Sequence, residues 1–368
     1  MPLVTTNEML KKAQAGHYAV GAFNVENMEM VMAVIKAAEE MNSPVIMQTT
    51  PSTVKYAGLD YYLAMVRTAA ERASVPVAIH LDHGSSFDLA MKALKAGYTS
   101  VMIDGTSLPF DENVELTREV VKYAHERGVS VEGELGVLAG VEDHVFSTTS
   151  TYTNPLKAIE FFKKTGVDAL AISYGTMHGA SKGKNVKLRK EIAIAIKECM
   201  MHEGIFGVLV SHGSSTVPKY IVDEINALGG NIQNAYGISI DELKAAIPCG
   251  IGKINVDTDI RLAVTRNMKE FFANHPEKRE SQSIGEVYRL LEAKKEQFDP
   301  RAFLTPIMDT VMYGIIPDED VAALMAVVEK GVKEAIGTLI VEFGSYGKAP
   351  LVEMASLDEM AERYRKGL

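Results

Sequence analysis

The chain has 368 residues, of which 47% are hydrophobic and 23% are charged, and its formal net charge is −10. This length and composition predict a globular chain with a large buried core, organised as one large domain or two ordinary ones. The acidic balance and the shortness of the basic stretches disfavour a nucleic-acid groove, which needs clustered lysine and arginine.

The cysteines and the lack of a signal-like or membrane-spanning segment indicate the cellular compartment. Cys199 and Cys249 do not form a CxxC pair, so we expect neither a disulfide framework nor a cysteine-based zinc site. The first residues lack a basic region followed by an apolar region, and no segment reaches the ~18 consecutive apolar residues of a membrane helix. We therefore expect a cytoplasmic protein that binds neither membranes nor nucleic acids.

Short apolar runs alternate with segments of helical period over most of the chain. Their starts are 24 to 45 residues apart, which is the spacing of repeated β-loop-α-loop units. Near-continuous apolar strands are typical of a parallel sheet buried on both faces. The pattern predicts a (β/α)8 TIM barrel, an α/β fold, with a doubly wound open sheet as the alternative. The expected strands are 19–23, 44–49, 76–81, 100–104, 129–134, 168–173, 207–211 and 252–256.

The clearest helical periods fall in residues 27–41 and 113–127, where apolar residues recur every three or four positions. Gly97 and Gly166 stand just before the next expected strand, where glycines commonly end helices. After residue 262 the pattern becomes mostly helical, and no Gly/Ser linker separates a second domain. We expect one domain over the whole chain, with additional C-terminal helices that extend the barrel.

Three histidines each follow an apolar run and precede a glycine. They are His83 in AIHLDHG, His178 in AISYGTMHG and His212 in VLVSHG. In a parallel barrel the C-terminal ends of the strands meet at one rim. Three imidazoles at that rim can hold a divalent metal and leave one coordination position open for a substrate. A metal-dependent enzyme is therefore the leading hypothesis.

Further polar residues lie at the same strand ends. Asp82 directly precedes His83, and a carboxylate there can orient the ligand or exchange a proton with a bound substrate. The small residues of GTMHGASK and HGSS could cradle an anion with their backbone N–H groups, and Lys182 could add a positive charge. Asn255 and Asp257 share one face of the last strand by alternation. A metal site and a phosphate site would therefore be neighbours.

In these motifs the chain resembles the class II, zinc-dependent fructose-bisphosphate aldolases. The similarity covers nearly all of residues 1–262 and resumes at 298–301 and around 342–345. The resemblance implies a TIM barrel and an aldolase, a carbon-carbon lyase. The motifs, in chain order, are Gly21-Ala-Phe-Asn-Val, His80-Leu-Asp-His-Gly-Ser-Ser, Val101-Met-Ile-Asp, Val131-Glu-Gly-Glu-Leu-Gly, Gly175-Thr-Met-His-Gly, His212-Gly-Ser-Ser and Lys253-Ile-Asn-Val-Asp-Thr-Asp.

The resemblance implies a role for each residue near the metal. The three histidines would hold one catalytic Zn²⁺, with Glu134 near an alternative buried metal position. Asp82 would be the acid/base at the aldehyde oxygen, Glu142 the carboxylate that moves the proton at the reacting carbon, and Asn255 a contact to the enediolate. Cleavage leaves negative charge on that enediolate, so a metal Lewis acid makes a Schiff-base lysine unnecessary.

The resemblance also implies two groups of substrate contacts, with a monovalent cation, Na⁺ or K⁺, often assisting at the first phosphate. The family's arginine at position 261 can come from a neighbouring subunit, and we expect a homodimer or homotetramer. The positions for the phosphate at carbon 1 are Gly179, Lys182, Gly213, Ser215, Asp257 and Thr258, and those for the rest of the substrate and its far phosphate are Asn24, Thr50, Arg261 and Arg301.

The chain departs from the family pattern in ways that bear on the substrate. Residues 279–297 and 314–333 look like helical insertions, and a tail begins at about residue 346. The insertions lie near the part of the site that would recognise the distal end of a sugar. We expect cleavage of fructose 1,6-bisphosphate to dihydroxyacetone phosphate and glyceraldehyde 3-phosphate. The alternatives are tagatose 1,6-bisphosphate or another ketose 1-phosphate, such as a sulfonated one, and cobalt in place of zinc.

Two alternatives come from other functional classes. A barrel metallohydrolase also uses histidines at strand ends, but it would usually show His-x-His after the first strand, where this chain has Ala22-Phe-Asn-Val. A non-catalytic sugar-phosphate binder would keep the binding residues and lose catalysis. Both Asp82 and Glu142 are present, which argues against that loss.

Overall fold

The protein is described by a computed structural model that leaves out residues 1–2, 143–144, 181, 309, 311–317 and 368 and the side chains of 141–146. Each of the eight predicted runs overlaps one strand of a closed parallel barrel, with ends that differ by at most one residue. The strands are β1 (Val20–Asn24), β2 (Val45–Thr49), β3 (Val77–Leu81), β4 (Ser100–Ile103), β5 (Ser130–Leu135), β8 (Ala169–Ile172), β9 (Val208–Ser211) and β10 (Ile251–Val256). Their order is β1-β10-β9-β8-β5-β4-β3-β2, which confirms the TIM barrel and shows that the open sheet is wrong.

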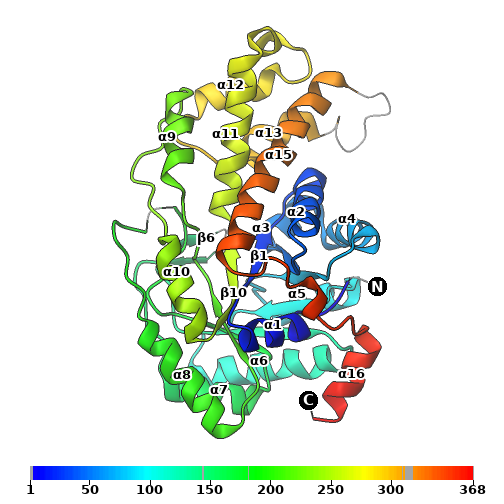
Figure 1. Ribbon diagram of the computed structural model, residues 1–368, viewed down its shortest axis with the longest axis vertical. Helices are drawn as coiled ribbons and strands as arrows, with labels where there is room; N and C mark the ends of the chain where they lie inside the picture. The colour runs from blue at the N-terminus through cyan, green and yellow to red at the C-terminus, as the bar shows by residue number, and fades with distance from the viewer. Residues whose placement is uncertain (1–2, 143–144, 181, 309, 311–317, 368) are drawn as a thin grey trace.

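Helices connect successive strands and surround the barrel (Figure 1). The predicted helices 27–41 and 113–127 are found as α2 and α6, and Gly97 and Gly166 end α5 and α7 in the left-handed conformation. A two-stranded hairpin, β6 (Gly140–Glu142) with β7 (Val145–Ser147), follows β5. The helices are α2 (Met28–Glu40), α3 (Pro51–Ala57), α4 (Leu59–Arg72), α5 (Phe87–Ala96), α6 (Phe110–His125), α7 (Pro155–Thr165), α8 (Lys190–Glu203), α9 (Lys219–Ala227), α10 (Ile240–Ala246) and the 3-10 turn η1 (Ile247–Cys249).

The interior of the barrel changes from apolar to polar along the strands. At the N-terminal end, α1 (Thr6–Ala15) contributes Met9 and Leu10 to a buried cluster that includes Ala78 of β3. The next positions on the same face of that strand are His80 and then Asp82, and both are fully buried. Apolar packing therefore closes one end of the barrel, and the groups capable of chemistry gather at the other.

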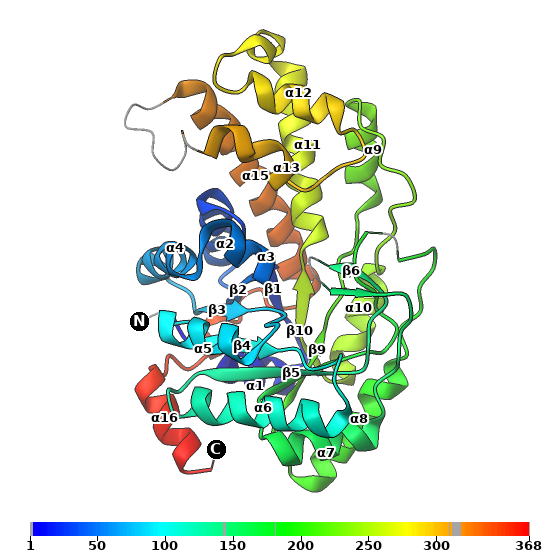
Figure 2. The same ribbon diagram turned by 180° about the vertical axis from the view of Figure 1, so that it is seen from behind.

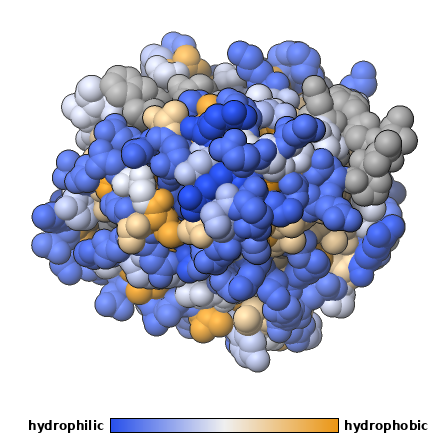
Figure 3. All heavy atoms as spheres, turned by 90° about the horizontal axis from the view of Figure 1, so that it is seen from above, coloured by the Kyte–Doolittle hydropathy of each residue, from blue (hydrophilic) through white to orange (hydrophobic). Residues whose placement is uncertain are grey.

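A bundle of helices projects from the C-terminal end of the barrel (Figures 1 and 2). The helix α15 packs against both α11 and α2, and Lys333 forms an ion pair of 2.6 Å with Glu40 of α2. Seen from above, this end of the molecule is mainly hydrophilic (Figure 3). The elements are α11 (Thr258–Asn274), η2 (Pro276–Glu280), α12 (Gly285–Ala293), α13 (Arg301–Leu304), η3 (Thr305–Ile307) and α15 (Glu319–Glu342).

The two expected insertions fall in this bundle. Residues 279–297 include α12. The described part of 314–333 is residues 318–333, which are Asp318 and the N-terminal part of α15. That they are insertions within a single domain stays a prediction. None of the helices in the described part of the chain is long and apolar enough to cross a membrane.

The tail after residue 346 returns to the N-terminal end of the barrel through η4 (Ala349–Leu351) and α16 (Leu357–Arg365). Tyr364 of α16 stacks on His125 of α6 with 3.6 Å between ring centroids. Its hydroxyl donates to Asp168 Oδ1 at 2.8 Å, and His125 Nε2 lies 2.9 Å from Asp168 Oδ2. One aspartate with a largely buried side chain thus joins the C-terminal helix to the barrel.

Replacing Tyr364 with phenylalanine keeps the stacked ring and removes the donor to Asp168. We expect Tyr364→Phe to lower the free energy of unfolding by about 1–2 kcal/mol, because a buried acceptor loses one partner. Chemical denaturation measures the effect. Tyr346→Phe is the matched control, since that side chain is 59% exposed. Equal denaturation midpoints for the two variants would show that the hydroxyl does not hold α16.

Candidate metal centre and substrate pocket

The three histidines singled out by the sequence come together at the C-terminal rim. His83 and His212 follow β3 and β9, and His178 lies on the loop after β8. The ring centroid of His83 is 4.7 Å from that of His212 and 5.2 Å from that of His178, while His178 and His212 are 6.5 Å apart. All three side chains are buried.

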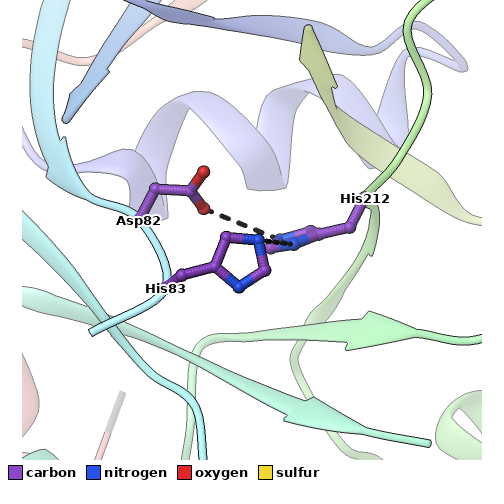
Figure 4. A group of neighbouring side chains, drawn as sticks. All are labelled: Asp82, His83 and His212. Carbon is purple, nitrogen blue, oxygen red and sulfur yellow. Dashed lines mark hydrogen bonds and ion pairs between the residues drawn. The ribbon is translucent and has the colours of Figure 1, made fainter. Parts of the chain in front are cut away.

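One set of potential ligand atoms belongs to Asp82, His83 and His212, and these atoms all lie within 4.8 Å of one another (Figure 4). His212 Nδ1 lies 3.1 Å from His83 Nε2, so two ring nitrogens face the same point. His178 stands outside this tight set, although its ring adjoins that of His83. Imidazole nitrogens with a nearby carboxylate are the donors that zinc prefers, so the residues fit a divalent metal.

The backbone around His83 is specialised for this placement. His83 adopts φ of +47°, a left-handed conformation that non-glycine residues seldom take. A Cβ on the next residue, Gly84, would lie 2.1 Å from the carbonyl oxygen of Met102. Only glycine therefore allows the chain after β3 to pass so close to β4, and this close passage brings the His83 ring into the site.

Glu132 on β5 orients His212. His212 Nε2 donates to Glu132 Oε1 at 2.7 Å, which leaves Nδ1 directed at His83. Lys253 of β10 donates to the other oxygen of Glu132 at 2.7 Å, and its side chain is fully buried. Burial would raise the pKa of Glu132, but Lys253 and His212 outweigh it and hold that pKa well below its usual range. The carboxylate is thus charged and fixes the histidine tautomer.

Glu132 and Lys253 are absent from the sequence-based predictions, although a signal for both existed. Glu132 is two positions before Glu134 in VEGE, and Lys253 is two positions before Asn255 in KIN. Alternation along a strand places each pair on the same face, so both residues point into the barrel.

A second cluster with metal-ligand chemistry comprises His83, Asp104 and Glu134. His83 Nδ1 lies 3.7 Å from Asp104 Oδ2 and 3.9 Å from Glu134 Oε2. Burial, with Asp104 alongside, raises the pKa of Glu134 to about 8. Its Oε2 has no hydrogen-bond partner in the described part of the chain. The cluster fits the alternative metal position expected at Glu134 and adds Asp104, which sequence reasoning missed at the end of the run 100–104.

Two amide side chains clamp the Asp82 carboxylate. Gln48 Nε2 donates to Asp82 Oδ2 at 3.0 Å, and Asn255 Nδ2 donates to Asp82 Oδ1 at 3.1 Å. Gln48 also donates to Asn24 Oδ1 at 2.8 Å, so Asn24 joins the same group.

Gln48 is not among the residues predicted from the sequence. It lies two positions before Thr50, whose hydroxyl accepts from the backbone of α3 at its N-terminus. The Glu142 side chain lies outside the described residues.

A cavity of about 100 Å³ adjoins the histidines and contains every position predicted for the carbon 1 phosphate. Lys182 is buried there, and its ammonium donates to the carbonyl oxygens of Met177, at 2.6 Å, and Gly213. The buried lysine and the positive end of the α11 helix dipole give the cavity the character of an anion site. A monovalent cation at this point stays a prediction. The cavity is lined by Gly179, Lys182, Gly213, Ser214, Ser215, Asn255, Asp257, Thr258, Arg261 and Phe298.

Of the two predicted arginines, Arg261 lines this cavity, and Arg301 is connected to it through Asp299, which hydrogen-bonds both. Arg261 Nη2 pairs with Asp257 Oδ2 at 2.6 Å, and its Nη1 donates to Asp299 Oδ2 at 2.8 Å. Arg301 Nη2 donates to Asp299 Oδ2 at 2.7 Å. An additional buried carboxylate, Glu26, lies 3.3 Å from Arg261 Nη2 and was not predicted.

Comparison with known proteins identifies the family to which this arrangement of histidines, carboxylates and Lys182 belongs. The family described as fructose-bisphosphate aldolase class-II matches residues 4–348. A fructose-bisphosphate aldolase of Giardia intestinalis is 40% identical over 367 residues, which are 99% of this chain and 100% of that protein. The chain belongs to the class II fructose-bisphosphate aldolase family. It is therefore a lyase of a family that is metal-dependent in general, which confirms the resemblance seen in the motifs.

Other relatives agree with this assignment. A fructose-bisphosphate aldolase of Thermus caldophilus is 43% identical over 311 residues, covering 84% of this chain and 94% of that protein. Among solved structures, the YdjI aldolase of Escherichia coli K12 superposes with a TM-score of 0.68 at 30% identity, covering 94% of this chain and 99% of that one. The chain thus shares its sequence with named fructose-bisphosphate aldolases and its fold with a solved aldolase.

Removing the charge of Glu132 tests its role toward His212. We expect Glu132→Gln to weaken Zn²⁺ binding about 10- to 100-fold, because the ligand tautomer is no longer fixed by a carboxylate. Chelator competition with the purified protein measures the affinity. Lys253→Met is the matched control, since it breaks the same buried pair and leaves the contact between Glu132 and His212. An equal loss of affinity in both variants would indicate a purely structural ion pair.

Proposed function

We propose that this class II aldolase is zinc-dependent and reversibly cleaves fructose 1,6-bisphosphate to dihydroxyacetone phosphate and glyceraldehyde 3-phosphate. The observation that carries the proposal is the meeting of His83, His178 and His212 beside Asp82, next to a buried cavity that contains Lys182. The names of the relatives from Giardia intestinalis and Thermus caldophilus support the substrate. We further propose one domain per chain, a homodimer or homotetramer, and a cytoplasmic location.

The residues divide the reaction between them. His83, His178 and His212 would hold Zn²⁺, with Glu134 at the alternative position, and the bound ion would supply Lewis-acid stabilisation of negative charge on the substrate. Asp82, held by Gln48 and Asn255, is placed to take the hydroxyl proton during cleavage and return it during condensation. Asn255 reaches the same point and would contact the enediolate oxygen. We assign the second proton transfer, at carbon, to Glu142.

Substrate binding falls to the residues around the cavity. Lys182, the adjoining backbone N–H groups and the N-terminus of α11 would hold the carbon 1 phosphate. Arg301 and Arg261, with Asn24 and Thr50, would contact the rest of the substrate and its far phosphate. Holding both ends fixes the bond to be broken relative to the metal and to Asp82, which is the positioning that lowers the barrier.

A panel of phosphorylated ketoses, assayed with and without chelator on metal-analysed protein, tests the proposal. We expect cleavage of fructose 1,6-bisphosphate that is lost with chelator and restored by Zn²⁺. Activity confined to tagatose 1,6-bisphosphate or to a sulfonated ketose 1-phosphate would overturn the substrate. Membership of the aldolase family favours this reaction over a barrel metallohydrolase or a non-catalytic sugar-phosphate binder.

Alanine variants separate metal binding from proton transfer. His83→Ala, His178→Ala and His212→Ala should lose bound metal and activity together, because each removes a ligand. Asp82→Ala should keep the metal and lose turnover by about 10²- to 10⁴-fold, as removal of a general acid/base does. Metal analysis and a cleavage assay measure both properties. The control is His202→Ala, whose side chain is 86% exposed. Full zinc stoichiometry in any of the three histidine variants would count against the ligand set.

Arg301 tests the far end of the substrate. We expect Arg301→Ala to raise KM for fructose 1,6-bisphosphate about 10- to 100-fold with a smaller effect on kcat. A remote charged contact contributes to the ground state and the transition state alike. Steady-state kinetics measure both constants. Arg289→Ala on α12, with a side chain 65% exposed, is the control. An unchanged KM would show that Arg301 does not meet a phosphate.

A further inference from the structure

The arginines at the far end of the substrate pocket are not a simple cationic site. Arg261 and Arg301 carry two positive charges, while Glu26, Asp257 and Asp299 carry three negative charges within the same cluster. The five side chains therefore sum to one negative charge when all are ionised. This is an unusual balance for a place expected to receive a phosphate dianion.

Glu26 contributes the most deeply buried of these charges. It follows β1 by two residues, and its side chain is 2% exposed. Its Oε1 lies 3.3 Å from Arg261 Nη2 and 3.4 Å from Arg301 Nε. The hydroxyl of Tyr62 donates to its backbone carbonyl at 2.8 Å and fixes the turn that directs the side chain. A carboxylate is thus already located between the two guanidinium groups.

Glu26 differs from the aspartates in how it meets the arginines. Asp257 makes a two-point pair with Arg261 along one helix, at 2.7 and 2.6 Å, and so positions that side chain. Asp299 hydrogen-bonds both arginines at 2.7 to 2.8 Å. Glu26 lies farther from both arginines, at 3.3 and 3.4 Å. At these distances hydrogen bonds are weak, and the attraction between opposite charges dominates. The main effect of Glu26 is to offset positive charge that a phosphate would otherwise use.

We propose that Glu26 is a specificity-determining residue, an internal anion that competes with the far phosphate of the substrate for Arg261 and Arg301. This inference rests on the proposed aldolase function. A phosphate dianion entering the cluster meets a site that is already negative and shielded from water, where like charges repel strongly. A ketose 1-phosphate with an uncharged far end meets no such repulsion. Glu26 therefore lowers the preference for the bisphosphate over the monophosphate.

The test is the ratio of kcat/KM for fructose 1,6-bisphosphate to kcat/KM for fructose 1-phosphate. We expect Glu26→Gln to raise this ratio about tenfold, mainly through a lower KM for the bisphosphate, because removing a repulsion strengthens binding of the far phosphate. Glu29→Gln is the matched control. It removes a partly buried carboxylate from the first turn of α2 that interacts with Glu329 rather than with the arginines, and it should leave the ratio at the wild-type value.

The possible outcomes separate this inference from the function on which it rests. Wild-type protein that cleaves neither ketose phosphate contradicts the proposed function. Wild-type cleavage of both, with an unchanged or lower ratio in Glu26→Gln, overturns the role of Glu26 and leaves the aldolase assignment intact. Glu26→Met removes the same charge with an apolar side chain of similar length. It replaces the amide variant if that protein does not fold, with the same tenfold rise expected.

Discussion

The carboxylate of Glu132 is the contact on which the catalytic end of the barrel depends. It lies inside a closed ring of strands, accepts a hydrogen bond from His212 and pairs with the buried ammonium of Lys253. An unpaired charge at this depth would be strongly destabilising, so the carboxylate, the lysine and the histidine must be buried together or not at all. As a result, Nε2 of His212 is hydrogen-bonded to Glu132, and Nδ1 of the same ring faces His83.

The barrel makes such a network possible because its interior is not uniform. Alanine, valine and larger apolar residues fill the end covered by α1, while Gln48, His80 and Glu132 occupy the level below the rim. The polar groups at that level hydrogen-bond largely to one another and to the residues above them. Asp82 lies above them, and the side-chain amides of Gln48 on β2 and Asn255 on β10 donate to its two oxygens. Asp82 and His212 are thus oriented by side chains on rigid strands, which support a precise site better than loops do.

The two ends of the candidate substrate pocket differ in the balance of their charged side chains. In the cavity near His178, the buried Lys182 is joined by the ion pair of Arg261 and Asp257, so the charged side chains of the described lining sum to one positive charge. At the other end, arginines are interleaved with carboxylates from β1, α11 and the segment before α13. Family membership shows a carbon-carbon lyase, whereas in the proposed function the far end is the part of the pocket that meets the released aldehyde.

The sequence alone was enough to predict the barrel, because eight apolar runs in repeated units and the glycines at helix ends are local signals that the tertiary structure did not override. It also predicted that the three histidines and Asp82 meet at one rim, since strand ends of one barrel necessarily share a rim. The phosphate positions came from the family resemblance, and their role stays a prediction. Alternation could have revealed Glu132, Lys253 and Gln48, but nothing in a single strand shows that a glutamate and a lysine 121 positions apart will pair. Only closure of the barrel brings β5 and β10 to the same interior point. The position of Glu26 between two arginines from other segments was likewise decided by the tertiary structure, because long-range charge contacts leave no periodic trace in the chain.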